Sequence, residues 1–328
     1  RLTRVRRREK TRTKKSVPIV GIGASAGGLE AFRTLLEALP RETGIAYVLV
    51  QHLDPDHESM LAELLARATE IPVIEVTHRT LVKPDHVYVI SPGKNMALEG
   101  DTLTLSPRSK ESGAVNMPID HFFRSLAFAR EERAIGVVLS GTASDGTLGL
   151  RAIKAVGGLT FVQNSTAKYQ GMPQAAISAG VADYVLSPPK IAEELVAVTK
   201  HPLVNVRGPG AGEAVLTAHD DFQKIIGELL LATGVDLHHD KETTRTRRIT
   251  RRMLVNKKIT PREYLTYLRG NNQESEALLN DILINVTGYF RDPPALQCLV
   301  KKILPQLVRN KPAKEPLRVW VAACATGE

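Results

Sequence analysis

Short apolar runs alternate with segments of helical periodicity over residues 17–200 of this chain. VPIVGI, which begins at Val17, precedes a helical pattern at residues 28–39, and YVLVQ at 47–51 precedes another near 58–68. The alternation continues as a strand, a helix and a strand, at residues 135–141, 147–156 and 159–163. Apolar strands that alternate with helices are typical of a parallel sheet with helices on both faces. We therefore expect a doubly wound, mostly parallel α/β fold here.

Other segments depart from that alternation. HVYVISPGKNMALEGDTLTL, at residues 86–105, predicts shorter strands with turns at PGKN and EGD, which indicates an antiparallel appendage. VNVRGPGAGEA, at 204–214, is rich in glycine and is interpreted as a linker. Beyond it the periodicity is only helical, with a first helix ending at Gly234 and further helices at residues 243–255, 261–269, 274–285 and 294–308. RVWVAACATGE, at residues 318–328, predicts a new strand and turn.

The chain of 328 residues is long enough for more than one domain. We expect five regions. They are a basic disordered tail at 1–16, an α/β domain at 17–200, a linker at 201–214, a small all-α domain at 215–292 and the truncated start of a second α/β domain at 293–328. The sequence begins at Arg1 rather than at methionine, which is consistent with a fragment.

The formal net charge of +9 is concentrated in the tail. Residues 1–15 contain nine basic side chains and one acidic one, so the rest of the chain is close to neutral and gives no nucleic-acid signal. The tail has no aromatic residue and no apolar face, which favours a solvated arm. No window predicts membrane insertion or a signal peptide, and two cysteines, Cys298 and Cys324, favour a reducing cytoplasm over a disulfide framework.

Ser25 is the hydroxyl in GIGASAGG, the turn between the first predicted strand and helix. Gly23 to Gly27 fit G-x-S-x-G, in which a sharp turn exposes a nucleophilic serine and a helix N-terminus offers N–H groups to an oxyanion. The same letters give Gly21-x-Gly23, the opening of a dinucleotide-binding fingerprint. That alternative requires an acidic residue at the end of the second strand. Asp54 lies slightly beyond that end, so the nucleotide alternative stays open.

His52 and Asp145 follow two other predicted strands. The carboxyl ends of parallel strands share one edge of the sheet, where open α/β folds bind ligands. Ser25, His52 and Asp145 would supply a nucleophile, a base for its proton and a carboxylate that fixes the imidazole tautomer. Spacing alone does not exclude that His57, Asp54 or Asp120 takes the place of His52 or Asp145.

GIGASAGG, VQHL, SGTASDGT and VQNSTAKYQGMPQAAI occur in this order, and residues 17–200 resemble the CheB family of chemotaxis protein-glutamate methylesterases. The resemblance implies hydrolysis of glutamate γ-methyl esters, and deamidation of certain glutamines, on the helical cytoplasmic region of chemoreceptors, without a metal or organic cofactor. It implies the same triad, Ser25, His52 and Asp145, with backbone N–H groups of Ala26 and Thr142 as oxyanion donors. Family members often have threonine and methionine at these last two positions, a difference expected to affect substrate fit more than competence.

Three later segments are LLLATGVDLHHDKETTRTRRITRRM, NVTGYFRDP and RVWVAACATGE. Through these segments the chain from about residue 214 resembles the CheR family of chemoreceptor methyltransferases. This implies an all-α domain followed by the start of a Rossmann-like methyltransferase domain. The positions that match S-adenosylmethionine contacts are Asn285, Thr287, Arg291 and Glu328. Because the rest of that site would lie after Glu328, we expect no methyl transfer and no S-adenosylmethionine binding by this chain.

Arg245, Arg248 and Arg252 lie on one predicted helix face and are candidates for contact with an acidic receptor helix, although a solvated charged face has the same pattern. The leading hypothesis is a serine methylesterase fused to an incomplete methyltransferase. Two alternatives remain, a non-catalytic receptor-docking module and a nucleotide-binding sensor that uses Gly21 and Gly23.

Overall fold

The computed structural model describes residues 17–52, 59–108, 116–201, 211–238, 241–283 and 297–309. The chain divides into two compact units, Arg1–Ile282 and Leu283–Glu328, and each is described by itself.

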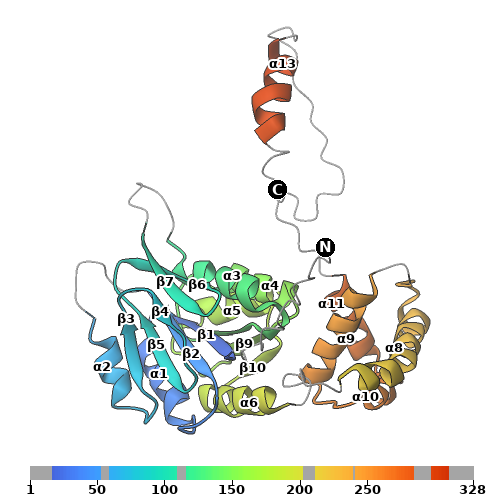
Figure 1. The fold of residues 1–328 in the computed structure, drawn as a ribbon, viewed down its shortest axis with the longest axis horizontal. Helices are drawn as coiled ribbons and strands as arrows, with labels where there is room; N and C mark the ends of the chain where they lie inside the picture. The colour runs from blue at the N-terminus through green and yellow to red at the C-terminus, as the bar shows by residue number, and fades with distance from the viewer. Residues whose placement is uncertain are drawn as a thin grey trace, which may run out of the picture. The chain divides into compact units, whose positions relative to one another are not determined.

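A seven-stranded sheet forms the centre of the first unit (Figure 1). Its strand order is β10-β9-β8-β1-β2-β5-β3, and every neighbouring pair is parallel. The strands are β1 (Ile19–Ala24), β2 (Ala46–Gln51), β3 (Val73–Val76), β5 (His86–Ile90), β8 (Ile135–Val138), β9 (Leu159–Gln163) and β10 (Tyr184–Leu186). The expected parallel α/β fold is confirmed.

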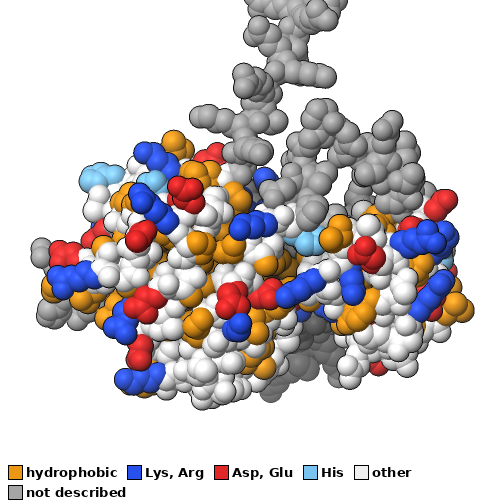
Figure 2. Space-filling view, turned by 90° about the horizontal axis from the view of Figure 1, so that it is seen from below, with side chains coloured by type: hydrophobic (Ala, Val, Ile, Leu, Met, Phe, Trp, Pro, Cys, Tyr) orange, Lys and Arg blue, Asp and Glu red, His pale blue; other side chains and the backbone are white. Residues whose placement is uncertain are grey.

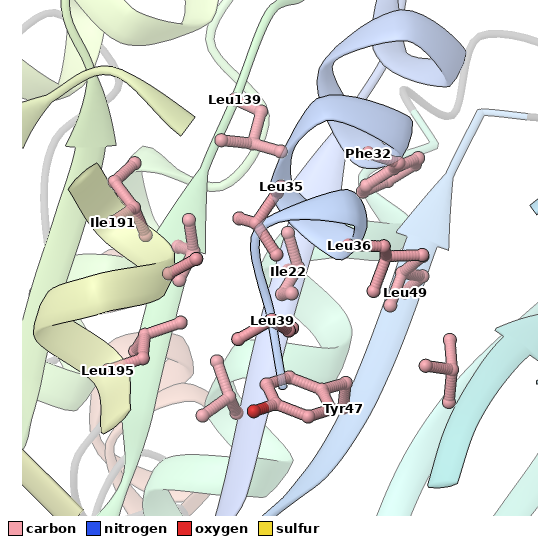
Figure 3. Close-up of a cluster of buried hydrophobic side chains, with 14 of the residues drawn as sticks. Ile22, Phe32, Leu35, Leu36, Leu39, Tyr47, Leu49, Leu139, Ile191 and Leu195 are labelled. Atoms are coloured by element: carbon pink, nitrogen blue, oxygen red, sulfur yellow. The ribbon is translucent and has the colours of Figure 1, made fainter. Parts of the chain in front are cut away.

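Helices cover both faces of this sheet and bury two hydrophobic clusters against it. One face carries α1 (Gly28–Glu37), α2 (Leu61–Ala66) and α6 (Pro188–Lys200). Figure 3 shows Ile22 of β1, Leu35 of α1 and Ile191 of α6 among the buried side chains of the first cluster. The other face carries α3 (Pro118–Arg130), followed by the short η1 (Glu131–Arg133), α4 (Thr147–Ala155) and α5 (Gly171–Ser178).

Glycines of β1 allow α3 to approach the sheet closely. A Cβ atom at Gly21 would lie 2.9 Å from a ring carbon of Phe122, and one at Gly23 would lie 2.3 Å from Ile119 Cγ2. Contacts this short do not occur between real side chains, so any larger residue would push α3 away. These two glycines therefore have a packing role on a face that α3 covers.

A smaller antiparallel sheet has the order β4-β7-β6 and consists of β4 (Thr80–Leu81), β6 (Lys94–Glu99) and β7 (Thr102–Pro107). The expected appendage is therefore present, but its first predicted strand belongs elsewhere. β5 lies between β2 and β3 in the main sheet, because Val87 and Val89 pack into one buried cluster and Tyr88 and Ile90 into the other. A strand buried on both faces suits the interior of a covered parallel sheet.

The described residues that follow in the same unit form α8 (Ala211–Thr233), α9 (Glu242–Val255), α10 (Pro261–Leu268) and α11 (Asn272–Ile282). They share a third buried cluster that includes Ile225, Leu229 and Tyr264. At the start of α10 the Thr260 hydroxyl accepts a hydrogen bond from Glu263 N, a side-chain cap of the helix. Helix α8 begins at Ala211, so the last residues of the expected linker are helical, and residues 202–210 lie outside the described residues.

Within the second unit, residues 299–303 form a π-helical turn that continues into α13 (Leu304–Arg309). This matches the last part of the helix expected at 294–308, whereas the strand expected at 318 lies outside the described residues. No helix among the described residues is both long and apolar enough to cross a membrane. On the face drawn in Figure 2, basic and acidic side chains are intermingled, consistent with near-neutral charge after the tail.

Candidate functional site

The candidate site lies at the point where the order of strand addition reverses, beside β1. From β1 the chain adds β2 on one side, whereas β8, β9 and β10 extend the sheet on the other. Ligands of open α/β sheets bind outside the carboxyl ends of strands at such a switch point. Ser25 directly follows β1, His52 directly follows β2, and Asp145 lies in the loop that follows β8. The three sequence-predicted residues thus lie at the ends of adjacent strands.

Ser25 is half-buried in a tight turn between β1 and α1. Its N–H donates to Ser140 O at 2.9 Å, and its carbonyl accepts from Gly28 N at 2.8 Å. Gly27 completes the turn with φ 71°, a conformation that favours glycine. Among the described residues, the Ser25 hydroxyl has no hydrogen-bond partner, so it is available to react with a substrate.

His52 is held by a buried carboxylate. Its Nε2 lies 2.7 Å from Asp145 Oδ2, with the imidazole 38% exposed and the carboxylate 1% exposed. When Nε2–H donates to Asp145, the other nitrogen, Nδ1, is left with a lone pair that can accept a proton. His52 and Ser25 are not hydrogen-bonded to each other in this structure, a looseness common in catalytic sites without substrate.

Asp145 is fixed by the N-terminus of α3 as well as by His52. Oδ1 accepts from Asp120 N at 2.9 Å and from Gly146 N at 2.8 Å, and Oδ2 accepts from Ile119 N at 3.0 Å. The N–H groups of Ile119, Asp120 and Gly146 are all donors, so both carboxylate oxygens of Asp145 act as acceptors. Asp145 therefore has the geometry of the orienting acid.

Asp120 was an open substitute for Asp145, and its carboxyl instead accepts from Gly149 N at 2.6 Å. Burial raises the pKa of this carboxyl, the Gly149 hydrogen bond opposes the shift, and the nearby Asp145 charge adds to it. No contact joins Asp120 to His52 among the described residues. The other two substitutes, Asp54 and His57, lie outside the described residues.

Because its pKa is raised, ionised Asp120 should cost the folded state stability. The cost is absent in acid below the usual aspartate pKa of about 3.9 and develops as the pH rises toward the raised folded-state value. Asp120→Asn keeps an oxygen acceptor for Gly149 and removes the charge, so we expect it to be more stable than wild type at neutral pH and equal to it in strong acid. Thermal unfolding at several pH values measures this, and a wild type that is more stable at neutral pH would contradict it.

Two backbone N–H groups near the Ser25 turn, those of Ala26 and of Thr142, donate to no backbone acceptor among the described residues. The peptide between Ser25 and Ala26 has its carbonyl bonded to Gly28 N, so the N–H of Ala26, on the opposite side of that planar unit, points away from the helix. The second N–H is that of Thr142, an exposed residue between Gly141 and the left-handed Ala143, φ 61°. Both N–H groups suit the donor role expected of Ala26 and Thr142.

Ser140, which was not among the sequence-predicted site residues, connects the Ser25 turn with the loop that follows β8. Its hydroxyl donates to Ala26 O at 2.9 Å and accepts from Tyr169 N at 3.0 Å, while its own N–H donates to Gln163 Oε1 at 2.9 Å. Its carbonyl accepts from Ser25 N. The available signal was a serine two residues after β8, at the same sheet edge as Ser25 and His52.

Replacing Ser140 with alanine should loosen the Ser25 turn without removing a reacting group. A misplacement of about 1 Å can cost about 10²-fold, so we expect kcat for ester hydrolysis to fall by one to two orders of magnitude with KM nearly unchanged. Steady-state kinetics measures this split. Ser165→Ala, an exposed serine in the neighbouring loop, is the matched control, and equal kinetics of the two variants would exclude the positioning role.

The nucleotide alternative finds no support in the turn. Gly21 and Gly23 contact α3, as described above, and a Cβ atom at Gly27 would lie 2.8 Å from Ser140 Oγ and 3.1 Å from the Tyr169 ring. The glycines are thus used by packing within the protein rather than by an open phosphate cradle. The described residues also contain no cluster of His, Cys, Asp or Glu suited to a metal ion.

Two of the three arginines that are candidates for receptor contact are buried in this structure, and the third is half-buried. Arg245 is 7% and Arg248 is 2% exposed, and Arg252 forms an ion pair with Glu274. Contact of these arginines with an acidic receptor helix stays a prediction, and in this structure carbonyls of α4 occupy Arg248 while Glu274 of α11 pairs with Arg252. The residues matched to cofactor contacts, Asn285, Thr287, Arg291 and Glu328, lie outside the described residues.

Comparison with known proteins places this site in a family. A family model described as CheB methylesterase matches residues 20–195, more than half of the chain. The chain belongs to the CheB methylesterase family. A second model, the all-alpha domain of CheR methyltransferase, matches residues 220–283, which include α9, α10 and α11.

Individual relatives agree with this assignment. A putative protein-glutamate methylesterase/protein-glutamine glutaminase of Leptospira interrogans is 38% identical over 56% of this chain and 95% of its own length. The Thermotoga maritima CheB methylesterase catalytic domain superposes with a TM-score of 0.51 at 31% identity, over 56% of this chain and 99% of that domain. An uncharacterized 104.1 kDa protein of Rhodobacter capsulatus is 35% identical over a region of 288 residues. That region covers 82% of this chain and 30% of the Rhodobacter protein.

Proposed function

We propose that this chain is a protein-glutamate methylesterase in which Ser25 is the nucleophile, His52 the base and Asp145 the orienting acid. The observation that carries the proposal is the hydrogen bond between His52 and buried Asp145. Both residues follow strands adjacent to β1, which presents a Ser25 hydroxyl that has no partner within the described part of the chain. Membership of the CheB methylesterase family supports the choice of ester chemistry.

The reaction begins with attack of Ser25 Oγ on the ester carbonyl carbon, while the hydroxyl proton passes to His52 Nδ1. Asp145 stabilises the imidazolium that forms, through Nε2–H. When the tetrahedral intermediate collapses, His52 returns the proton to the departing methoxide oxygen and methanol leaves. A water molecule then gives a proton to His52 and attacks the acyl-serine, releasing the glutamate carboxyl and regenerating Ser25.

The negative oxygen of each tetrahedral intermediate is stabilised by the N–H groups of Ala26 and Thr142. Preorganised backbone donors cost no reorganisation at the moment of reaction, and each is worth roughly 10²–10³-fold in comparable hydrolases. A backbone donor is independent of side-chain identity, so alanine and threonine at these positions are compatible with turnover. The same machinery attacks a glutamine side-chain amide, with ammonia in place of methanol as the leaving group.

The proposed substrate is a methylated helical segment in the cytoplasmic region of a chemoreceptor or a similar signalling protein, which makes the cytoplasm the proposed location. The esterase reaction uses no cofactor. S-adenosylmethionine is the methyl donor of the CheR family, and no step proposed here passes through it. Residues 17–200, 215–292 and 293–328 are proposed as the esterase domain, the CheR-type helical domain and the beginning of a methyltransferase domain.

Methanol release tests the proposal. Receptor membranes carrying labelled methyl esters are incubated with the chain, and volatile label is measured against a sample without protein. We expect time-dependent methanol release and covalent labelling of Ser25 by a serine-directed phosphonate. A folded protein that binds these membranes but neither releases methanol nor reacts with the phosphonate would instead be a docking module.

A further inference from the structure

Helix α9 is bound to the esterase domain through a buried charge cluster. Arg251, which is 1% exposed, donates through one Nη to Asp183 of the esterase domain and through the other to Asp281 of α11. Its Nε donates to Gly158 O at 3.0 Å. Asp183 lies just before β10 and is 68 residues from Arg251 in the sequence, yet this guanidinium joins it directly to the helical domain. A single side chain therefore links the two domains.

Lys154, near the end of α4, completes the cluster from the esterase side. Its Nζ lies 3.5 Å from Asp183 Oδ1 and 3.8 Å from Asp281 Oδ1. Thr160 of β9 also donates to Asp183, from N at 3.0 Å and from Oγ1 at 2.9 Å. Burial alone would raise the pKa of Asp183, but the charges of Arg251 and Lys154 hold that pKa below its usual value. The two cations and two carboxylates thus balance each other in the buried interface.

A second arginine of α9 reaches the esterase domain one turn earlier. Arg248 donates to the carbonyl oxygens of Lys154, at 2.6 Å, and of Ala155, at the carboxyl end of α4. A cation is favourable at this end of a helix, where the last carbonyls lack partners within the helix. At the far end of α9, Tyr184 Oη of β10 donates to Val255 O at 3.1 Å. The contacts therefore extend from the middle of α9 to its C-terminal end.

We propose that the face of α9 that carries Arg248 and Arg251 is an intramolecular docking surface for the esterase domain, and that docking excludes an acidic helix from these two arginines. The carboxylate of Asp183 already occupies Arg251, and carbonyls of α4 occupy Arg248. An acidic partner helix binds this face only after α9 separates from the esterase domain. This proposal concerns the interface alone and stands whether or not Ser25 hydrolyses esters.

Asp183→Lys in the full chain tests the docking, because it places a third cation against Arg251 and Lys154. We expect wild type to unfold in one calorimetric transition that includes both domains, and the variant to unfold in two. Glu193→Lys is the matched control, since it makes the same charge change on an exposed residue of α6. Two transitions in wild type, or one in Asp183→Lys at the wild-type temperature, would overturn the proposal.

Binding of a labelled, glutamate-rich helical peptide tests the exclusion. If docking leaves about a tenth or less of the molecules open, apparent affinity is lowered at least about tenfold, so Asp183→Lys should bind the peptide at least about tenfold more tightly than wild type. Glu193→Lys has the same net charge and should bind as wild type does. Equal affinity of wild type and Asp183→Lys would overturn the exclusion.

A charge-swapped variant covers the case in which Asp183→Lys does not fold. Asp183→Lys combined with Arg251→Asp keeps two cations and two carboxylates in the cluster. We expect this variant to regain a single unfolding transition and weak peptide binding. A folded swap, by circular dichroism, that still shows two transitions and tight peptide binding would contradict the assigned charge pairing.

Discussion

Ser25→Ala is expected to lower kcat/KM for ester hydrolysis by roughly 10⁴-fold or more while leaving the fold intact. The reason for the large loss is that alanine has no hydroxyl oxygen with which to form the acyl intermediate. The reason for intact folding is that the Ser25 hydroxyl has no hydrogen-bond partner among the described residues, whereas its backbone N–H and carbonyl keep theirs. Released methanol measures activity, and thermal unfolding measures stability.

Ser144→Ala provides the matched control for that experiment. Ser144 is an exposed serine in the loop that carries Asp145, and its replacement should leave turnover unchanged. His52→Ala should be as damaging as Ser25→Ala, and the double variant no worse than the worse single one, because the triad acts as a unit. Ordinary turnover by folded Ser25→Ala would show that another residue is the nucleophile.

The arrangement of the candidate triad could be predicted because parallel strands end at one edge. Ser25, His52 and Asp145 each follow an apolar run, and the structure brings the last two into hydrogen-bond contact. The choice between Asp145 and Asp120 could not be predicted from spacing. It depends on α3, whose N-terminus holds Asp145 while Asp120 turns toward Gly149.

Helix α3 itself was not predicted, although its sequence contains the signal. Ile119, Phe122, Phe123 and Leu126 are buried at helical spacing, behind a proline at the first turn. Strand β3 had a weaker signal, because it is a four-residue edge strand in which only Val76 is buried. Short edge elements bury few apolar residues, so their pattern along the chain carries little information.

The burial of the α9 arginines lay beyond sequence reasoning for a different reason. Spacing places Arg245, Arg248 and Arg252 on one helix face, but the same spacing serves a solvated face and an interface. What covers the face depends on residues distant in the chain, such as the carbonyls of α4 that accept from Arg248. Periodicity identifies a face of a helix and leaves its partner undetermined.

Asp145→Asn is expected to lower kcat/KM by roughly 10⁴-fold, a loss comparable to that of Ser25→Ala, and also to lower stability. Both oxygens of Asp145 accept hydrogen bonds, whereas asparagine offers one oxygen and one NH2 group. If the oxygen stays with Asp120 N and Gly146 N, the NH2 group faces Ile119 N–H and His52 Nε2. His52 must then carry its proton on Nδ1, so the nitrogen meant to accept the serine proton is blocked.

The same substitution leaves Ile119 N–H without its acceptor, at a cost of about 1–3 kcal/mol in the free energy of unfolding. Asp120→Asn is the matched control, because it removes the neighbouring buried carboxylate without touching His52, and it should keep activity. Methanol release and thermal unfolding of both variants separate the two effects. If Asp145→Asn lost stability but kept its turnover, the hydrogen bond to Asp145 would serve the N-terminus of α3 and not the tautomer of His52, and the base would have to be oriented by another group.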